Sequence, residues 1–126
     1  ARLKFVDDLM HSETALPLTG ADTVMSEAIV VMTEKALGCL GVVDADGVLQ
    51  GIITDGDLRR NMGNGLLDRR AAEIMTPAPK TVTRGIMASA ALEIINARAI
   101  TALFVVEEGR PVGLVHIHDL LRAGVA

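Results

Sequence analysis

The sequence predicts a mixed α/β (α+β) fold made of two pseudo-symmetric β-α-β-β-α repeats packed as one module. Two observations lead to this prediction. The same blocks of sequence occur twice in the same order, and such self-similarity is the signature of a repeat architecture. Half of the 126 residues are hydrophobic, which is enough for a buried core, but one repeat alone would bury too little surface to be robust. We therefore expect the two copies to pack together.

The repeat is clearest where 44–58 resembles 107–120, with one residue lost in the second turn. Shorter matches lie upstream in each copy. They pair 8–11 with 73–76, 28–32 with 91–95, and 42–43 with 105–106. These matches place the first repeat, with an N-terminal lead-in, at 1–65 and the second repeat at 66–126.

Each copy is expected to run as a strand, a helix, a hairpin and a second helix. Asp46-Gly47 and Glu108-Gly109 suit hairpin turns, and Thr23 and Gly38 suit the cap and the stop of the first helix. One face of that helix should be its core side, and it carries Val24, Ala28, Val31, Met32 and Ala36. The expected elements are 15–18, 24–36, 39–43, 48–53 and 55–62 in the first copy, and 81–83, 87–98, 102–106, 111–116 and 117–123 in the second.

The segment that joins the copies, 63–80, contains large apolar residues such as Leu66 and Ile74, so it is not a flexible polar linker. Its last part, 75–79, holds two prolines. Each proline fixes its own φ and restricts the residue before it. This part of the chain should therefore be rigid and bent.

Composition and charge argue against several classes of function. Phe5 and Phe104 are the only aromatic residues, whereas readers of single-stranded nucleic acid use aromatic stacking platforms, and a formal charge of −4 is unlike the basic surplus of duplex binders. Cys39 is the single cysteine, which excludes an intramolecular disulfide and favours a small buried hydrophobe over a reactive thiol. No apolar run has the length of a membrane span, and the first residues lack the apolar region of a signal peptide, so a cytoplasmic protein is expected.

These blocks carry a family resemblance that covers nearly the whole chain. Its carriers are Met10, 75–77, the helices around Ala28 and Ala91, 42–44, and the run Gly51-Ile52-Ile53-Thr54-Asp55-Gly56-Asp57-Leu58. With them the chain resembles a tandem pair of cystathionine-β-synthase (CBS) domains, also called a Bateman module. The second copy departs in its last block, 113–120. The resemblance implies a nucleotide-binding regulatory module that assembles as a homodimer or tetramer of CBS pairs.

A narrower resemblance is carried by 54–60 and 116–124, which are similar to the C-terminal part of D-arabinose-5-phosphate isomerases. In that family a sugar isomerase domain, which makes the precursor of the lipopolysaccharide sugar Kdo, precedes a CBS pair. The resemblance implies that this chain is the regulatory portion alone, without catalytic residues, cofactor or activity of its own. It also implies an N-terminal isomerase domain as its partner in the full-length protein.

Thr54-x-x-Asp57 stands where a strand is expected to end and a helix to begin, and free backbone N–H groups at such a place favour anions. The CBS resemblance implies that Thr54 contacts phosphate and that Asp57 accepts from two ribose hydroxyls, which a carboxylate can do. The alternative is a capping box, and the two roles are compatible. Asp55, Arg59 and Arg60 belong to the same candidate site, because a planar guanidinium suits phosphate or carboxylate. Exposed surface cations are the alternative for both arginines.

His116-x-His118-Asp119 is the least ordinary local feature. A His-x-His pair within a strand places both rings on one face, as metal sites often do, but the strand should end near His116 and no third ligand is evident nearby. We therefore expect no metal. The resemblance places His116 and Asp119 where Thr54 and Asp57 stand in the first copy, so the imidazoles would donate to a carboxylate, phosphate or sugar hydroxyl. Partly buried structural histidines are the alternative.

The resemblance also implies that the first strand of each copy and the start of its hairpin line a pocket for the base. These are 16–18 with 38–40 in the first copy, and Lys80, Thr81, Thr101 and Ala102 with their neighbours in the second. Leu18 and Val82 are expected in the core instead. Lys80 is either an anion contact or solvent-exposed.

Together these features predict a sensor that binds a nucleotide or sugar nucleotide in the cleft between the halves. Two imidazoles with an arginine nearby suit a sugar nucleotide that carries a carboxylate better than they suit AMP. The isomerase resemblance then points to CMP-Kdo, the activated end product of the pathway. The alternatives are a sensor of AMP or ATP and a structural oligomerisation module without ligand. Nucleic acid and membrane partners are not expected.

Overall fold

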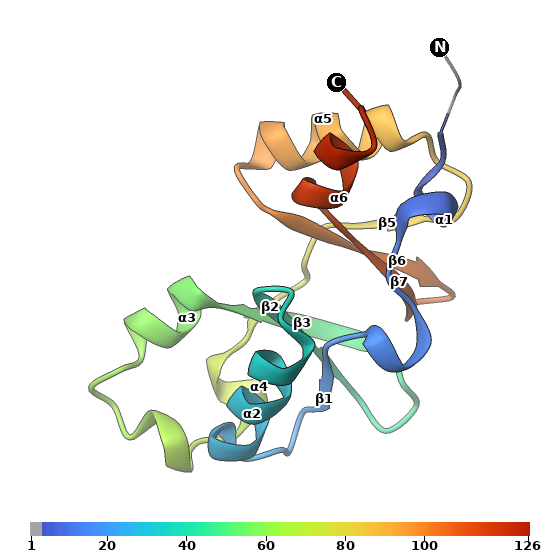
Figure 1. The fold of residues 1–126 in the computed structure, drawn as a ribbon. Helices are drawn as coiled ribbons and strands as arrows, with labels where there is room; N and C mark the ends of the chain where they lie inside the picture. Colours follow the sequence, from blue (N-terminus) through green and yellow to red (C-terminus); the bar gives the residue numbers. More distant parts are fainter. Residues whose placement is uncertain (1–3) are drawn as a thin grey trace. The chain divides into compact units, whose positions relative to one another are not determined.

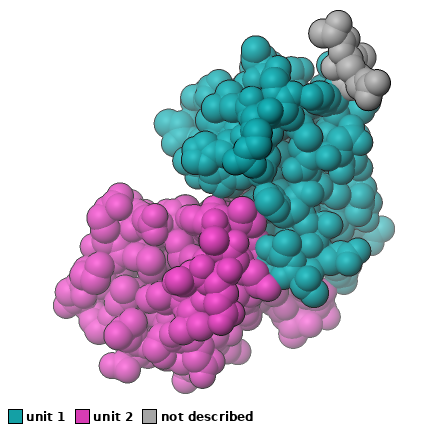
Figure 2. Space-filling model, viewed as in Figure 1, with its two compact units in different colours: residues 1–16, 80–126 teal, residues 17–79 magenta. Residues whose placement is uncertain are grey.

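The structure is a computed structural model that describes residues 4–126. The chain divides into two compact units, which are coloured separately in Figure 2. Unit 2 consists of 17–79, and the described part of unit 1 consists of 4–16 together with 80–126. The units therefore do not coincide with the sequence repeats at 1–65 and 66–126. The lead-in of each repeat belongs to the unit built from the other repeat.

Unit 2 contains a four-stranded sheet in the order β1-β2-β3-β4, in which β1 and β2 are parallel and the other pairs antiparallel. Helix α2 packs along β1 and β2 (Figure 1). The elements of this unit are β1 (Leu18–Gly20), α2 (Met25–Lys35), β2 (Cys39–Val43), β3 (Leu49–Thr54), α3 (Asp55–Arg60), η2 (Leu66–Asp68), α4 (Ala71–Ile74) and β4 (Thr76–Pro77).

Unit 1 contains a three-stranded sheet in the order β5-β6-β7, with the same parallel and antiparallel pairs as β1-β2-β3. Helices α5 and α6 pack against each other, and α1 lies against β7 and α5, as the blue N-terminal segment in Figure 1 shows. The elements are α1 (Val6–Leu9), η1 (Glu13–Ala15), β5 (Thr81–Thr83), α5 (Ala88–Arg98), β6 (Ala102–Glu107), β7 (Arg110–His116) and α6 (Ile117–Arg122).

The edge of each sheet is completed by a lead-in segment. In unit 2, β4 pairs with β3 through Thr76 and Ile52. In unit 1, His11 forms the equivalent antiparallel bridge to Leu114 of β7, with N–H···O distances of 2.8 and 2.9 Å in the two directions. The sequence match between 8–11 and 73–76 thus corresponds to two segments with the same structural role.

Two glycines allow the lead-in segments to lie this close. A Cβ on Gly51 would stand 2.5 Å from Sδ of Met75 and 2.8 Å from the carbonyl oxygen of Thr76. A Cβ on Gly113 would meet the side chain of Met10 in the same way. Each methionine therefore occupies the space that a side chain on the neighbouring strand would need.

Each unit has its own core, built almost entirely from aliphatic side chains as the composition predicts. Met25, Leu40 and Ile53 are fully buried in unit 2. Val6 of α1 is fully buried in unit 1 together with residues of α5 and β6. No helix in the described part of the chain is long and apolar enough to cross a membrane.

The structure corrects several sequence-based boundaries in the first copy. Ala15 belongs to the short helix η1, and the first strand begins at Leu18, which is half-buried, whereas Val82 is buried as expected. Thr23 does not cap α2. Val24 forms an isolated bridge with Arg70 and takes the cap position, so the helix begins one residue later.

The C-terminal end of α2 also differs from the prediction. Ala36, not Gly38, is the first left-handed residue after the helix, with a φ of 57°, and its N–H donates to the carbonyl of Met32. Ala99 has the same role after α5, with a φ of 53°. The core face of α2 is formed by Met25, Ala28 and Met32, while Ala36 is exposed. The helices predicted at 55–62 and 117–123 end at Arg60 and Arg122.

Candidate functional site

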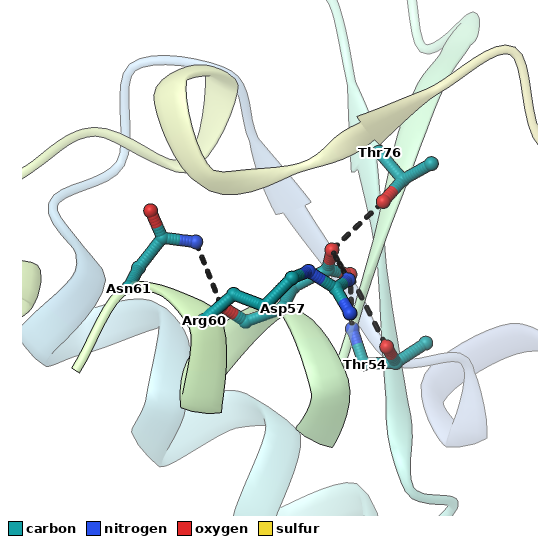
Figure 3. Close-up of polar contacts among 5 residues, drawn as sticks. All are labelled: Thr54, Asp57, Arg60, Asn61 and Thr76. Carbon is teal, nitrogen blue, oxygen red and sulfur yellow. Dashed lines mark hydrogen bonds and ion pairs between the residues drawn. The ribbon is translucent and has the colours of Figure 1, made fainter.

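Asp57 is the centre of a polar cluster in unit 2, at the junction of β3 and α3 (Figure 3). Its Oδ2 accepts from the backbone N–H of Thr54 at 2.9 Å and from the Thr54 hydroxyl at 3.2 Å. Its Oδ1 accepts from Nη2 of Arg60 at 2.6 Å and from the hydroxyl of Thr76 at 2.7 Å. Four donors therefore fill the acceptor capacity of this carboxylate.

The Asp57 side chain is only 5% exposed, so its charge is stabilised by these donors rather than by water. Burial alone raises the pKa of Asp57, but the hydrogen bonds from Thr76, from both donors of Thr54 and from Arg60 outweigh it and lower the pKa below its ordinary value. The carboxylate is thus ionised at neutral pH. The contact between Asp57 and the backbone of Thr54 is one half of a capping box, which confirms the structural reading of this motif.

The residues of α3 around Asp57, and the residue that follows this helix, differ in exposure and contacts. Arg60 contacts Asp57 although its own side chain is 67% exposed. Arg59 and Asp55 are exposed on the short helix α3. Asn61, which follows the helix, donates its side-chain amide to the carbonyl of Asp57 at 2.7 Å.

A second cluster occupies the equivalent place in unit 1, at the junction of β7 and α6. Nε2 of His11 donates to Oδ2 of Asp119 at 2.7 Å, and Nη1 of Arg122 lies 3.6 Å from Oδ1 of the same carboxylate. His116 is the last residue of β7 and caps α6, because its Nδ1 accepts from the backbone N–H of His118 at 3.1 Å. The rings of His116 and His118 lie 4.7 Å apart.

The cap fixes the tautomer of His116. Since Nδ1 accepts a hydrogen bond, the proton of the neutral ring is on Nε2. Burial lowers the pKa of His116 first of all, and the neighbouring His118 and His11 lower it further, while Asp119 acts in the opposite direction. His116 is therefore neutral at physiological pH.

The strand does end at His116, so the two histidines do not share one strand face, as the sequence analysis anticipated. His118 is exposed on α6. Among residues 4–126 no group of three histidine, cysteine or acidic side chains is arranged to hold a metal ion.

The remaining predicted site residues belong to the strands of unit 1. Ala102 is buried at the start of β6 and pairs with His116, and the carbonyl of Thr101 accepts from the N–H of Ile117 at 2.8 Å. These two residues are therefore next to the histidine cluster. Lys80 is exposed before β5, and Thr81 pairs with Phe104, further along β6.

Besides Asn61 and Arg122, which lie close in the sequence to the predicted aspartates, sequence reasoning missed Thr76 and His11. Both contact the aspartate of a cluster from a lead-in segment. The signal was present, because the match of 8–11 with 73–76 aligns His11 with Thr76. What was lacking was the knowledge that each lead-in belongs to the other repeat's unit.

Cys39 is not part of either cluster. It is buried at the start of β2, and burial raises the pKa of its thiol to about 12. The thiol is therefore protonated and unreactive at neutral pH, as the reading of a small buried hydrophobe predicts.

The model of the CBS domain family matches the chain twice, at residues 6–64 and 71–126. The chain belongs to the CBS domain family. The predicted tandem pair and its fold class are thereby confirmed, as is the expectation that these residues form a regulatory module rather than a catalytic domain. A solved CBS-domain protein from Agrobacterium tumefaciens, 28% identical, matches with a TM-score of 0.82 over 96% of this chain and 93% of its own.

Another solved CBS pair, described as a complex with 5′-methylthioadenosine and S-adenosyl-L-methionine, matches with a TM-score of 0.86 over 98% of this chain and 97% of its own. At 22% identity it shows the fold alone. Among curated relatives, arabinose 5-phosphate isomerase KdsD of Pseudomonas aeruginosa is 45% identical over 95% of this CBS pair and 38% of its own length. The CBS pair thus spans about two fifths of the relatives that it matches.

Proposed function

We propose that this CBS pair is the regulatory part of a longer arabinose 5-phosphate isomerase and that it binds CMP-Kdo as the end product of the pathway. The observation that carries the proposal is the 45% identity to the Pseudomonas isomerase over 95% of the chain. Binding would be passed to a sugar isomerase domain that precedes the pair in the full-length protein. A cytoplasmic location and assembly as a homodimer or tetramer belong to the same proposal.

Each aspartate cluster, taken by itself, presents more than one kind of polar group to a ligand. Thr54, Asp57 and Arg60 offer hydroxyl, carboxylate and guanidinium in unit 2, and imidazoles replace the hydroxyls in unit 1. Guanidinium and imidazole groups can both donate to a carboxylate or phosphate. A sugar nucleotide that carries an acidic sugar has both a carboxylate and a phosphate, whereas the only acidic group of AMP is its phosphate.

Asp57 can accept from ribose hydroxyls only after giving up donors that it already has. The backbone N–H of Thr54 is a fixed donor to Asp57, whereas Arg60 donates from a long and largely exposed side chain. The guanidinium is therefore the partner that a diol would displace, and it would then be free to bind the ligand's acidic group. Arg60→Ala removes the donor that competes with the diol and also removes the contact to the acidic group. The substitution should therefore weaken the binding of CMP-Kdo more than the binding of cytidine.

Calorimetry with CMP-Kdo, CMP, AMP and ATP tests the proposal. We expect CMP-Kdo to bind more tightly than CMP, because the acidic sugar adds contacts. Absence of heat with CMP-Kdo beside clear binding of AMP would replace the proposal by the second candidate, an adenine-nucleotide sensor. That candidate is favoured by the Thr54-x-x-Asp57 motif and by the adenosine ligands of the structurally similar CBS pair.

A structural role without ligand is the third candidate, and exposed apolar side chains on helices favour it. Val30 of α2 and Leu121 of α6 are each 53% exposed. A thermal-shift panel of nucleotides separates this role from a sensor, since a ligand that binds the folded state raises its apparent stability. A flat panel together with a stable dimer in light scattering would favour the structural role.

A further inference from the structure

The first residues of the lead-in in unit 1 are attached to the turn before α5. The N–H of Val6 donates to the carbonyl of Ile86 at 3.1 Å, and the N–H of Ala88 donates to the carbonyl of Lys4 at 2.8 Å. An isolated antiparallel bridge lies between these two bonds. The start of the lead-in is therefore joined to unit 1 by a short stretch of strand-like pairing.

The lead-in of unit 2 has the same two backbone bonds. The N–H of Ala71 donates to the carbonyl of Thr23 at 2.8 Å, and the N–H of Met25 donates to the carbonyl of Arg69 at 2.7 Å. Extension of the matched sequence blocks makes these four residues the counterparts of the four in unit 1. Unit 2 is thus an internal reference, because a contact that both units share is a requirement of the fold.

The third tie between lead-in and turn differs between the units. In unit 2 it is a backbone bond, from the N–H of Ala72 to the carbonyl of Ala21 at 3.0 Å. The counterparts of these alanines in unit 1 are Asp7 and Arg84. Oδ1 of Asp7 accepts from the backbone N–H of Gly85 at 2.8 Å, and its Oδ2 lies 3.6 Å from Nη1 of Arg84. Side chains in unit 1 therefore take the place of a backbone tie in unit 2.

Arg84 extends this tie to β6. Its Nε donates to Oε1 of Glu107, the last residue of β6, at 2.7 Å. The counterpart of Glu107 in unit 2 is Asp44, whose carboxylate accepts from groups of its own hairpin. In unit 1 one guanidinium thus joins the lead-in, the turn before α5 and the end of β6.

Lys4 ties the same segment to α6. Its Nζ donates to the carbonyl of Ala123, which follows that helix, whereas its counterpart Arg69 pairs with Glu73 of its own lead-in at 3.4 Å. Helix α6 carries Asp119 near its start, and β6 begins beside the same cluster. The lead-in therefore contacts the ends of α6 and β6 that are remote from the candidate site.

The ionic contacts of this tie are made by exposed side chains. Asp7, Arg84 and Glu107 are 36%, 44% and 54% exposed. An exposed ion pair contributes little to stability and is weakened by salt. The tie can therefore open and close while Val6, which is fully buried, keeps α1 in the core.

We propose that Asp7, Arg84 and Glu107 form a clasp that couples unit 1 to the domain that precedes this CBS pair in the longer protein. The inference rests on the proposed function in that a domain precedes the lead-in. Because β6 and α6 both end at the lead-in, displacement of either element opens or tightens the clasp and moves the chain that leads to that domain. The three are positioning residues. The other lead-in joins the units within this chain and has alanine at two of the three positions.

Hydrogen exchange in the 126-residue chain tests the clasp itself. Arg84→Gln removes both ion pairs, so the amides of Val6, Gly85 and Ala88 should lose about two- to fivefold of their protection, the range of an exposed ion pair. The corresponding amides of unit 2 should not change. Arg98→Gln removes an exposed positive charge from the other end of α5 and is the matched control. Unchanged protection in Arg84→Gln overturns the clasp.

The same measurement on the longer protein tests the coupling. Coupling between two sites is reciprocal, so the preceding domain should change the protection of these three amides by about twofold or more relative to the isolated pair. In Arg84→Gln this difference should disappear, because the clasp is open in both proteins. Fraying of a free chain end would instead give a difference that persists or grows in the variant. That result, or no difference in the wild type, overturns the coupling.

The outcomes separate this inference from the proposed function, because neither exchange experiment requires a ligand. If CMP-Kdo changes the activity of the longer protein, Arg84→Gln should keep the rate without ligand and lose most of the response, whereas Arg98→Gln should keep both. A full response in Arg84→Gln overturns the coupling. Absence of CMP-Kdo binding overturns the proposed ligand, and the exchange experiments still decide the clasp.

Discussion

At the scale of single residues, the carboxylate of Asp57 organises its surroundings. It joins the end of β3, the last turn of α3 and the segment that begins β4, because its donors come from all three. A buried charge of this kind is costly if any donor is removed. The cluster therefore contributes to stability whether or not a ligand binds.

The hydroxyl of Thr76 is the most informative of these donors to remove. In Thr76→Val the shape is kept but Oδ1 of Asp57 loses a hydrogen bond of 2.7 Å. We expect the free energy of unfolding to fall by about 1–3 kcal/mol, as for other hydrogen bonds to charged groups. Urea denaturation measures the change. Thr76→Ser keeps the hydroxyl and is the control, and equal stability of the two variants would contradict the role given to this bond.

Sequence reasoning found most of this site but not all of it. Thr54, Asp57 and Arg60 lie within seven positions of one another in a recognisable motif, so local pattern was enough to single them out. Thr76 is 19 positions from Asp57, and His11 is 108 positions from Asp119. Contacts over such separations depend on the path of the chain, which periodicity and propensity do not encode.

At the scale of elements, the short helix α6 begins at an imidazole. The pKa of His116 is lowered in the folded protein, mainly by burial and then by its histidine neighbours. The stabilisation that neutral His116 contributes is therefore complete above the pKa of about 6.5 that histidine has in the unfolded chain. It is lost as the pH falls through the lower pKa of His116 in the folded protein.

We expect the stability of the wild type relative to His116→Asn to decrease as the pH falls from 8 to 5. Asparagine retains a cap acceptor but has no proton to gain, so the difference isolates the titration of this ring. Urea unfolding at several pH values measures it. A difference that stays constant across this range would show that His116 does not titrate differently in the folded and unfolded states.

The approach of β3 and β7 to the lead-in segments gives a second prediction at this scale. Gly51→Ala would bring a Cβ within 2.8 Å of a backbone oxygen of Thr76, whereas at Gly113 the nearest atoms all belong to the Met10 side chain. Overpacking costs about 1–3 kcal/mol, so both variants should be destabilised. We expect Met10→Ala to rescue Gly113→Ala and Met75→Ala to rescue Gly51→Ala only in part.

Thermal unfolding of the four single and two double variants measures this asymmetry, with each methionine variant as the control for its own double. Equal rescue at both glycines would mean that the Thr76 carbonyl moves aside without cost. Most strand boundaries were predicted to within one residue, because alternating apolar residues and turn residues mark them locally. The exceptions are β1, which begins three residues later than expected, and β4, which was not predicted. Ala36 and Ala99 were not predicted as left-handed helix ends, since alanine carries no local preference for that conformation.

At the scale of the whole molecule, each unit combines parts of both sequence repeats, and unit 1 is in addition built from two separate pieces of chain. Val6 is fully buried in the core of unit 1, although it lies in the first repeat of the sequence. Ile74 is buried in the core of unit 2, although it lies in the second repeat. The duplication was predictable from matched blocks, but this exchange of lead-ins was not, because either assignment satisfies the same sequence pattern.

Val6→Ala should therefore destabilise unit 1 by about 1–3 kcal/mol and leave unit 2 largely unaffected. Ile74→Ala is the matched variant. It should destabilise unit 2 and leave unit 1 largely unaffected. Hydrogen exchange resolves the two, as amides of β6 and β7 should lose protection in the first variant and those of β2 and β3 in the second. Loss of protection in the repeat that carries the mutation would refute the assignment of each lead-in to the other repeat's unit.

The exchanged lead-ins also determine how the chain can be divided. A cut between residues 65 and 66 follows the duplication but separates 4–16 from the strands that they complete and 71–77 from theirs. Each fragment would then carry the piece that its counterpart needs. Two such fragments should remain unfolded alone and recover structure on mixing, whereas a boundary moved to 16/17 and 79/80 yields an autonomous middle fragment. We therefore expect that a single sequence repeat of this protein does not fold by itself.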